Sequence, residues 1–325
     1  MSFACRVCGN ATGNAEHTAR EMMFGTRDEF VYVECAKCGT LQIKEVPDLA
    51  KYYPENYLSF NSETPVGRTA IHRFAARAIG QYFVEGRGLD GKLLSRMRPG
   101  FAGNFPAALR DPELGLTFDS RILDFGCGKG QLLQTLHHFG FRDLTGADAF
   151  IEGDIELPTG LHILKRPLSE LEPAFDLIIM SHSFEHLPDP KAALLDAFRL
   201  LRPGGHLLIA MPVINFAWEK YGTDWVQLDA PRHLYLFTER AFTGLANDAG
   251  FSVASVRYES TAFQFWGSEM YRQDIQLIPD GAPGVIHPPD IFTGAQMAEW
   301  EREAVKLNDE GRGDTATFIL KRLAV

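Results

Sequence analysis

The chain of 325 residues is 45% hydrophobic and 23% charged, a composition that predicts one sizeable core and one or two smaller modules. Its formal net charge of −10 does not favour nucleic acid as a partner, because phosphate backbones attract basic surfaces. The first residues lack the basic start and apolar run of a signal peptide, and no segment approaches the roughly 18 consecutive apolar residues of a membrane span. A cytoplasmic protein without a membrane span is therefore expected.

Four of the five cysteines form two pairs with the spacing of zinc ligands. Cys5 and Cys8 are separated by two residues, as are Cys35 and Cys38, and a glycine follows each pair. Two cysteines at this spacing can place both thiolates on one tetrahedral ion. Redox-active or merely buried cysteines are the alternative, which is less favoured because cytosolic proteins rarely keep disulfides. A closed four-thiolate site leaves no position for a substrate, so a structural Zn²⁺ is expected.

The N-terminal third of the chain predicts a small module and a connector. Residues 29–35 alternate like a strand, which suits a zinc ribbon over 1–47 whose core is too small to fold without metal. Residues 48–118 then read as a connector, with aromatics and turn formers first and a helical pattern over about 66–83.

From Arg121 onward, apolar strand patterns alternate with helical patterns. This alternation predicts an α/β core over 119–325 with a parallel sheet covered on both faces. Ligands of such sheets lie outside the carboxyl ends of the strands. A long insertion at about 265–313 is of the kind that builds binding surfaces or oligomer contacts, so a homodimer is considered.

A glycine turn follows the first strand of this core directly. Gly126, Gly128 and Gly130 lie two residues apart, and Asp124 precedes them. A dinucleotide fingerprint would have its third glycine one residue later, so the spacing does not match a pyrophosphate cradle. Cys127, inside the turn, is interpreted as a packing residue and not as a nucleophile.

Four ordered motifs resemble those of class I S-adenosylmethionine-dependent methyltransferases: the glycine turn, DLTGAD, FDLIIMSHSFEHLPDP and LLRPGGHLLIAMP. The resemblance implies a Rossmann-like core with a mostly parallel seven-stranded sheet whose last strand is antiparallel. It also implies that Asp148 accepts hydrogen bonds from the two ribose hydroxyls of S-adenosylmethionine. Taken alone, Asp124 is as well explained by a strand-end cap and Asp148 by a turn, but the four motifs in order favour the cofactor. The implied cofactor residues are Asp124, Gly126, Cys127, Gly128, Gly130, Asp148, Ser181 and His182.

The cysteine pairs, the YYPENY segment, the core and the RHLYLFT segment together resemble bacterial sugar methyltransferases, including C-methyltransferases of nucleotide-linked keto-sugars. In the C-methyltransferases a glutamate and a histidine precede the aromatic run, whereas here Arg232 precedes His233. The implied acceptor is a small molecule, a nucleotide-sugar or glycan precursor, whose phosphate Arg232 would suit by its guanidinium geometry. Trp218, Tyr221 and Trp225 are expected either to roof the substrate cavity or to fill the core.

Methyl transfer requires an aligned acceptor that also loses a proton. A histidine is a suitable base at neutral pH. The candidates are His233 and His186, with Glu185 as an orienting or charge-balancing partner, and a structural hydrogen bond is the alternative for His186.

Two other functions remain open. The substrate could be RNA or protein, with the ribbon as a recognition module, although the acidic balance speaks against RNA. The chain could also bind S-adenosylmethionine without catalysis, against which the glycine turn and Asp148 argue.

Overall fold

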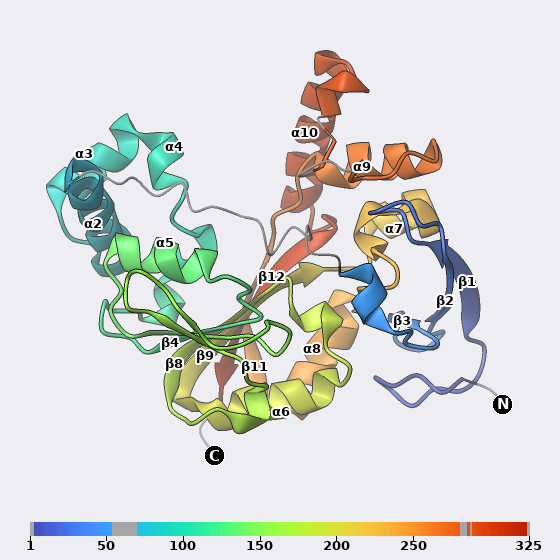
Figure 1. Ribbon diagram of the computed structural model, residues 1–325, viewed down its shortest axis with the longest axis horizontal. Coiled ribbons are helices and arrows are strands. Elements are labelled where there is room, and N and C mark those ends of the chain that lie inside the picture. Colours follow the sequence, from blue (N-terminus) through green and yellow to red (C-terminus); the bar gives the residue numbers. More distant parts are fainter. Residues whose placement is uncertain (1–2, 54–69, 280–284, 287, 324–325) are drawn as a thin grey trace.

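The computed structural model describes residues 3–53, 70–279, 285–286 and 288–323 (Figure 1). Parts of the predicted connector, 54–69, and of the predicted insertion, 280–284 and 287, lie outside the described residues. Among the described helices, none is long and apolar enough to cross a membrane.

The main sheet has eight strands in the order β11-β12-β9-β8-β4-β5-β7-β6. The neighbours from β9 to β7 pair in parallel, whereas β12 pairs antiparallel with both β9 and β11. The predicted Rossmann-like fold with an antiparallel last strand is confirmed, and β6 adds a two-residue edge strand to the expected seven. The strands are β4 (Ile122–Phe125), β5 (Leu144–Ala147), β6 (Ile155–Glu156), β7 (His162–Leu164), β8 (Phe175–Ser181), β9 (Leu201–Pro212), β11 (Phe251–Tyr258) and β12 (Thr315–Arg322).

Both faces of this sheet are covered, because its strands are apolar on both sides. Ile122 on β4 belongs to the core beneath α2 and α5, whereas its neighbour Leu123 belongs to the core beneath α6 and α8. Figure 1 shows α2 to α5 on one face and α6 and α8 on the other. The α-helices are α2 (Ala70–Glu85), α3 (Leu89–Met97), α4 (Pro99–Ala102), α5 (Gln131–Phe139), α6 (Pro190–Leu200), α7 (Phe216–Tyr221), α8 (Glu239–Asp248), α9 (Phe263–Arg272) and α10 (Gly294–Asp309).

A second, four-stranded sheet has the order β1-β2-β3-β10. Three of its strands come from the predicted ribbon: β1 (Ala15–Arg20), β2 (Glu29–Glu34) and β3 (Leu41–Ile43). The fourth, β10 (Tyr235–Leu236), comes from the main domain and pairs antiparallel with β3. The ribbon and the main domain therefore share a sheet.

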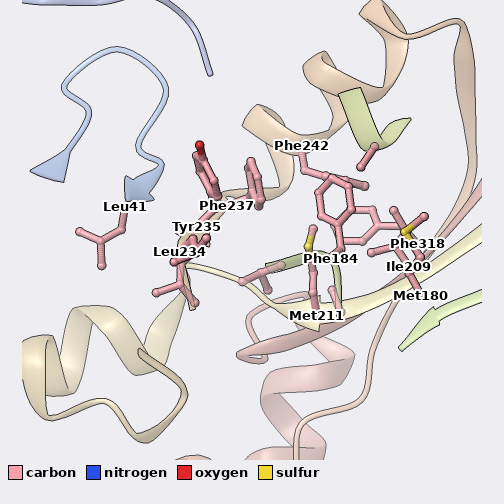
Figure 2. Close-up of a cluster of buried hydrophobic side chains, with 14 of the residues drawn as sticks. Leu41, Met180, Phe184, Ile209, Met211, Leu234, Tyr235, Phe237, Phe242 and Phe318 are labelled. Carbon is pink, nitrogen blue, oxygen red and sulfur yellow. The ribbon is translucent and has the colours of Figure 1, made fainter. Parts of the chain in front are cut away.

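They also share a hydrophobic core. Figure 2 shows Leu41 of the ribbon on the same side of the cluster as Leu234 and Tyr235, next to aromatic rings of the main domain. The rings of Phe184 and Phe242 lie 5.5 Å apart with edge-to-face geometry, which is a favourable arrangement for aromatic pairs. This packing anchors the loop after β8, where Phe184 begins a short 3-10 helix.

The predicted insertion contributes α9 and α10. The expected helix near Ala295–Asn308 is confirmed as α10, which begins with a capping box between Thr293 and Gln296. Figure 1 shows α10 extending away from the main sheet.

Candidate active site

The glycine turn lies at the carboxyl end of β4 and is held against the end of β5. Gly126, Gly128 and Gly130 have φ angles of 75°, 51° and 76°, a region that favours glycine. A Cβ on Gly126 would clash with the side chain of Ser183. The backbone N–H of Gly128 donates to Asp148 Oδ2 at 2.9 Å, so the acid at the end of β5 is tied to the turn.

The second oxygen of Asp148 accepts a hydrogen bond from the backbone N–H of Phe150 at 2.8 Å. The carboxylate is thus oriented by the backbone at the edge of a cavity that it lines. Two oxygens with remaining lone pairs are what the two hydroxyls of a ribose require. These residues fit the nucleoside part of S-adenosylmethionine.

Asp124, on β4 just before the turn, and Cys127, inside the turn, are both strongly affected by burial. Burial, followed by the nearby charge of Asp148, raises the pKa of Asp124 to about 7. Burial also raises the pKa of the Cys127 thiol far above its usual range, with Asp124 as the next cause. A thiol that keeps its proton is a poor nucleophile, which agrees with the packing role predicted for Cys127.

Two cavities meet at Gly126. One, of about 510 Å³, is bordered by Asp148, His182 and His186. The other, of about 440 Å³, is bordered by Asp124 and Ser181. The structure therefore brings the predicted cofactor residues to one edge of the sheet, around a turn that faces both cavities.

The loop after β8 carries three of the predicted residues into this region. Ser181 is exposed at the end of β8, and the His182 side chain keeps 48% of its surface exposed. Ser183 fixes the loop by donating from its hydroxyl to the Phe125 carbonyl at 2.9 Å. The loop then continues into the 3-10 helix Phe184–His186.

Glu185, His186 and His233 form a cluster behind the first cavity. Glu185 is fully buried, and its Oε1 lies 3.5 Å from His182 Nδ1 and 3.8 Å from His233 Nε2. The rings of His186 and His233 are 4.8 Å apart. The cavity is lined by His186, whereas His233 is not part of either lining and lies behind it.

Burial and the neighbouring charged groups together set the pKa values of Glu185, His182 and His233. Burial raises the pKa of Glu185, but the neighbouring histidines, His182 first, outweigh it and lower the pKa to about 2. Burial opposes a charge on His182, yet Glu185 leaves the pKa of His182 raised. Burial and then His186 lower the pKa of His233 to about 4, so this imidazole is neutral at pH 7.

Arg232 does not bind a substrate phosphate, and this expectation is corrected. Its side chain is completely buried, with Nη2 2.6 Å from Asp229 Oδ1 and 2.9 Å from Glu21 Oε1. It also donates to the Tyr52 carbonyl at 3.2 Å. The guanidinium expected to bind a phosphate binds two carboxylates instead, and these belong to the protein's own ribbon and to the loop that carries Arg232.

The ribbon holds the backbone on both sides of His233. The Tyr32 hydroxyl donates to the His233 carbonyl at 2.8 Å, and the Ile43 N–H donates to the Leu234 carbonyl at 3.0 Å. The Leu234 N–H in turn donates to the Glu185 carbonyl at 2.9 Å. The sheet of the ribbon is thus continuous with the histidine cluster.

Sequence reasoning missed several residues around this cluster. The hydroxyl of Tyr53 lies 3.2 Å from His186 Nδ1. Tyr53 belongs to the YYPENY segment, which supported the resemblance but did not predict a contact with the histidines. Asp229 is three residues before Arg232, a spacing at which an ion pair was foreseeable. Glu21 and Tyr32 gave no signal, because their partners are about 200 residues away in the chain.

The aromatic loop after β9 does not roof either cavity. Trp225 is fully buried and donates from Nε1 to Asp314 Oδ2 at 2.9 Å, and Tyr221 is buried as well. Trp218 packs its ring edge-to-face with His17 of the ribbon, with centroids 5.1 Å apart. Of the two expectations, core packing is the one the structure bears out.

The four cysteines of the ribbon converge. Their sulfurs lie within 4.8 Å of one another, with 3.7 Å between Cys5 and Cys38 and 3.5 Å between Cys8 and Cys35. Bonds of about 2.3 Å to a tetrahedral Zn²⁺ place sulfurs about 3.8 Å apart. Gln42 Nε2 donates to Cys5 Sγ at 3.0 Å, as expected around a thiolate. The donor set fits a zinc ion.

A family model described as "Methyltransferase domain" matches residues 69–256, more than half of the chain. The chain belongs to this family. The predicted methyltransferase class is thereby confirmed, and with it S-adenosylmethionine as the methyl donor that the family supports.

Curated relatives of this methyltransferase are named ubiquinone biosynthesis O-methyltransferase. The protein of Maricaulis maris is 30% identical over 161 residues, which cover 44% of this chain and 60% of the relative. That of Psychrobacter arcticus is 30% identical over 180 residues, which cover 47% of this chain and 68% of the relative. The chain thus spans about 60% of the length of the first of these relatives.

Solved structures of methyltransferases are similar at lower identity. An S-adenosylmethionine-dependent methyltransferase from Mesorhizobium loti is 20% identical with a TM-score of 0.43, covering 68% of this chain and all of that chain. A 1,6-didemethyltoxoflavin-N1-methyltransferase from Burkholderia thailandensis is 16% identical with a TM-score of 0.37, covering 79% and 92%.

Proposed function

We propose that this methyltransferase transfers the methyl group of S-adenosylmethionine to a hydroxyl or an enolisable carbon of a small, sugar-containing acceptor. The observation that supports the proposal is the cavity bordered by Asp148, Gly126 and His186, in which the acid that would bind the ribose, the glycine turn and a histidine surround one space. The sugar acceptor follows from the predicted resemblance, in which the ribbon accompanies the core.

The cofactor supplies an activated methyl group, and the chain has to hold and orient both reactants. Asp148 would bind the ribose hydroxyls, and the backbone of the glycine turn would approach the methionine part without a Cβ in the way. Ser181 and His182 would border the methyl group from the loop after β8. Asp124, Cys127, Gly128 and Gly130 would shape the turn beneath it.

His186 is the proposed base, because it lines the cavity. Its Nδ1–H donates to the Arg232 carbonyl at 2.9 Å, which leaves Nε2 to accept a proton from the acceptor. His233 and Glu185 lie behind it and would stabilise the charge that develops on the ring. Of the two candidate bases, the cavity lining therefore favours His186 over His233.

A phenolic acceptor is the second candidate. Apolar side chains line much of the same cavity, including Leu49, Ala50, Phe150 and Leu187, and would suit an aromatic ring. The curated relatives are named ubiquinone biosynthesis O-methyltransferase, and a phenol would likewise be methylated on oxygen.

A structural Zn²⁺ on the four cysteines is part of the proposal. The ion would hold the ribbon, and through β3 and β10 the ribbon would hold the histidine cluster. The division of the chain at residues 47 and 118, a homodimer and a cytoplasmic location stay predictions.

The test is a turnover assay by mass spectrometry with S-adenosylmethionine and two panels of acceptors. One panel contains nucleotide-linked keto- and hydroxy-sugars, and the other contains catechols and substituted phenols. A methylated sugar with an equal amount of S-adenosylhomocysteine supports the first candidate, and fragmentation identifies carbon or oxygen as the nucleophile. A methylated phenol alone would replace the sugar by the second candidate, and no product from either panel would overturn both acceptor classes.

A further inference from the structure

The Glu185 carboxylate is an unusual buried group. It is fully buried, and within the described part of the chain neither oxygen has a hydrogen-bond partner. The nearest cationic group is His182, whose Nδ1 lies 3.5 Å from Oε1. A carboxylate removed from water without hydrogen bonds costs several kcal/mol unless a cation compensates it. A further positive charge beside this carboxylate would therefore be stabilising, in addition to the neighbouring histidines.

The two adjacent histidines present the nitrogen that a metal ion binds. Nδ1–H of His186 donates to the Arg232 carbonyl at 2.9 Å, and Nδ1–H of His233 donates to the Gln227 carbonyl at 2.8 Å. A carbonyl oxygen can only accept, so both rings carry their proton on Nδ1 and leave the Nε2 lone pair available. This arrangement, a ligating ring with its other N–H on a carbonyl, is typical of histidines that bind metals.

The three side chains also converge. A ligand atom from each of Glu185, His186 and His233 lies within 4.8 Å of the other two. Metal bonds of about 2.0 to 2.2 Å require ligand atoms closer than about 4.4 Å. Glu185 Oε1 and His233 Nε2 already meet this limit, at 3.8 Å. Glu185 and His186 share the 3-10 helix after β8, and hydrogen bonds to the ribbon fix the His233 backbone.

We propose that Glu185, His186 and His233 bind a divalent transition-metal ion, separate from the ion of the four cysteines. Two imidazoles and one carboxylate suit Zn²⁺, Fe²⁺, Mn²⁺ or Co²⁺ and leave coordination positions open. Because His186 lines the cavity, an open position faces the space where the acceptor would lie.

One consequence rests on the proposed function. In the metal-bound protein His186 would hold the ion, and the ion would lower the pKa of an acceptor hydroxyl that binds it. The hydroxyl would lose its proton to water, and its oxygen would take the methyl group from the sulfonium, which leaves as S-adenosylhomocysteine. This replaces the role of base that His186 has in the metal-free protein.

The test titrates Co²⁺ into full-length protein whose ribbon is loaded with zinc, without S-adenosylmethionine or acceptor. We expect one Co²⁺ per chain, with d–d absorption bands and without the thiolate charge-transfer band that cobalt in the cysteine site would show. Glu185→Gln should weaken this binding at least tenfold, whereas His162→Gln, an exposed histidine on β7, should leave it unchanged.

Failure of the wild-type protein to bind Co²⁺ outside the cysteine site overturns the proposal, whatever the variants do. Equal Co²⁺ affinity in Glu185→Gln and wild type also overturns it. Neither result depends on turnover. The Co²⁺ titration therefore tests the metal site alone, and the product assay tests methyl transfer independently of it.

Discussion

Asp124 and Asp148 stand at the ends of adjacent strands, but their surroundings differ. Backbone N–H groups donate to both oxygens of Asp148, whereas burial and the charge of Asp148 raise the pKa of Asp124 to about 7. Two neighbouring buried acids cannot both ionise without a cost in free energy. Asp124 is therefore the acid of this pair whose proton is held by its surroundings.

Asp124 should make the protein less stable as the pH rises from about 4 to about 7. In this range the folded protein keeps the proton that the unfolded chain has lost, so the free energy of unfolding falls, by on the order of 4 kcal/mol in all. Asp124→Asn removes this ionisation. Urea denaturation at pH 5 and pH 8 should show a smaller loss of stability in the variant than in the wild type, and equal losses would contradict the raised pKa.

Single substitutions can test whether His186 or His233 acts as the base. His186→Ala should lower kcat by about 100-fold or more with cofactor affinity within a factor of about three, because general-base catalysis contributes roughly 10²–10⁴-fold. His233→Ala should have a smaller effect on kcat, since the ring lies behind His186. Kinetics and titration with S-adenosylhomocysteine provide both values, and a larger loss in His233→Ala would return the base role to His233.

At the scale of elements, β10 joins the ribbon to the histidine cluster. Its pairing with β3 and the hydrogen bond from Tyr32 to the His233 carbonyl fix the backbone on which the imidazole stands. Arg232, the residue directly before His233, adds buried ion pairs to Glu21 and Asp229. The ribbon therefore positions residues of the site from outside the cavity.

Tyr32→Phe should reveal this positioning. The variant leaves a buried carbonyl without its donor, which costs about 1 to 3 kcal/mol of stability. We also expect a severalfold lower kcat with an unchanged affinity for S-adenosylhomocysteine, because the cofactor turn is not contacted. Glu29→Gln, on the same strand and exposed, is the matched control. If kcat is unchanged while stability falls, Tyr32 has a structural role only.

At the scale of the whole molecule, the ribbon and the core form one hydrophobic unit. Ribbon residues such as Tyr32, Leu41 and Ile43 belong to the same buried cluster as Leu234 and Phe237 of the main domain. The Thr238 hydroxyl, which caps α8, also donates to the Cys38 carbonyl at 2.9 Å. Loss of metal from the cysteines should therefore also destabilise parts of the main domain, beyond residue 47.

Cys35→Ser should abolish tight zinc binding and loosen the histidine segment as well as the ribbon. Hydrogen exchange followed by mass spectrometry should show faster exchange over 15–43 and over 229–238, with the centres of β8 and β9 still protected. Exchange that changes in the ribbon alone would show that the two parts are energetically independent. Removal of zinc from the wild type with a chelator should give the same pattern.

The general architecture and the cofactor edge were predictable because their signals are local. The run of apolar strands alternating with helices predicts a doubly covered parallel sheet, and the glycine turn directly after β4 necessarily lies at the carboxyl end of that strand. The cysteine pairs were predictable for a similar reason, since two residues of spacing decide whether two thiolates can meet on one ion.

Long-range contacts decided the rest. The sequence by itself determined the fold class, the glycine turn and the four-sulfur cluster, because each depends on spacing within a few residues or on periodicity along one element. Only the tertiary structure decided that Arg232 is neutralised by Glu21 and Asp229, that His186 and not His233 lines the cavity, and that β10 completes the sheet of the ribbon. The physical reason is that burial and ion pairing depend on which distant segments pack together, and packing has no signature in the local pattern.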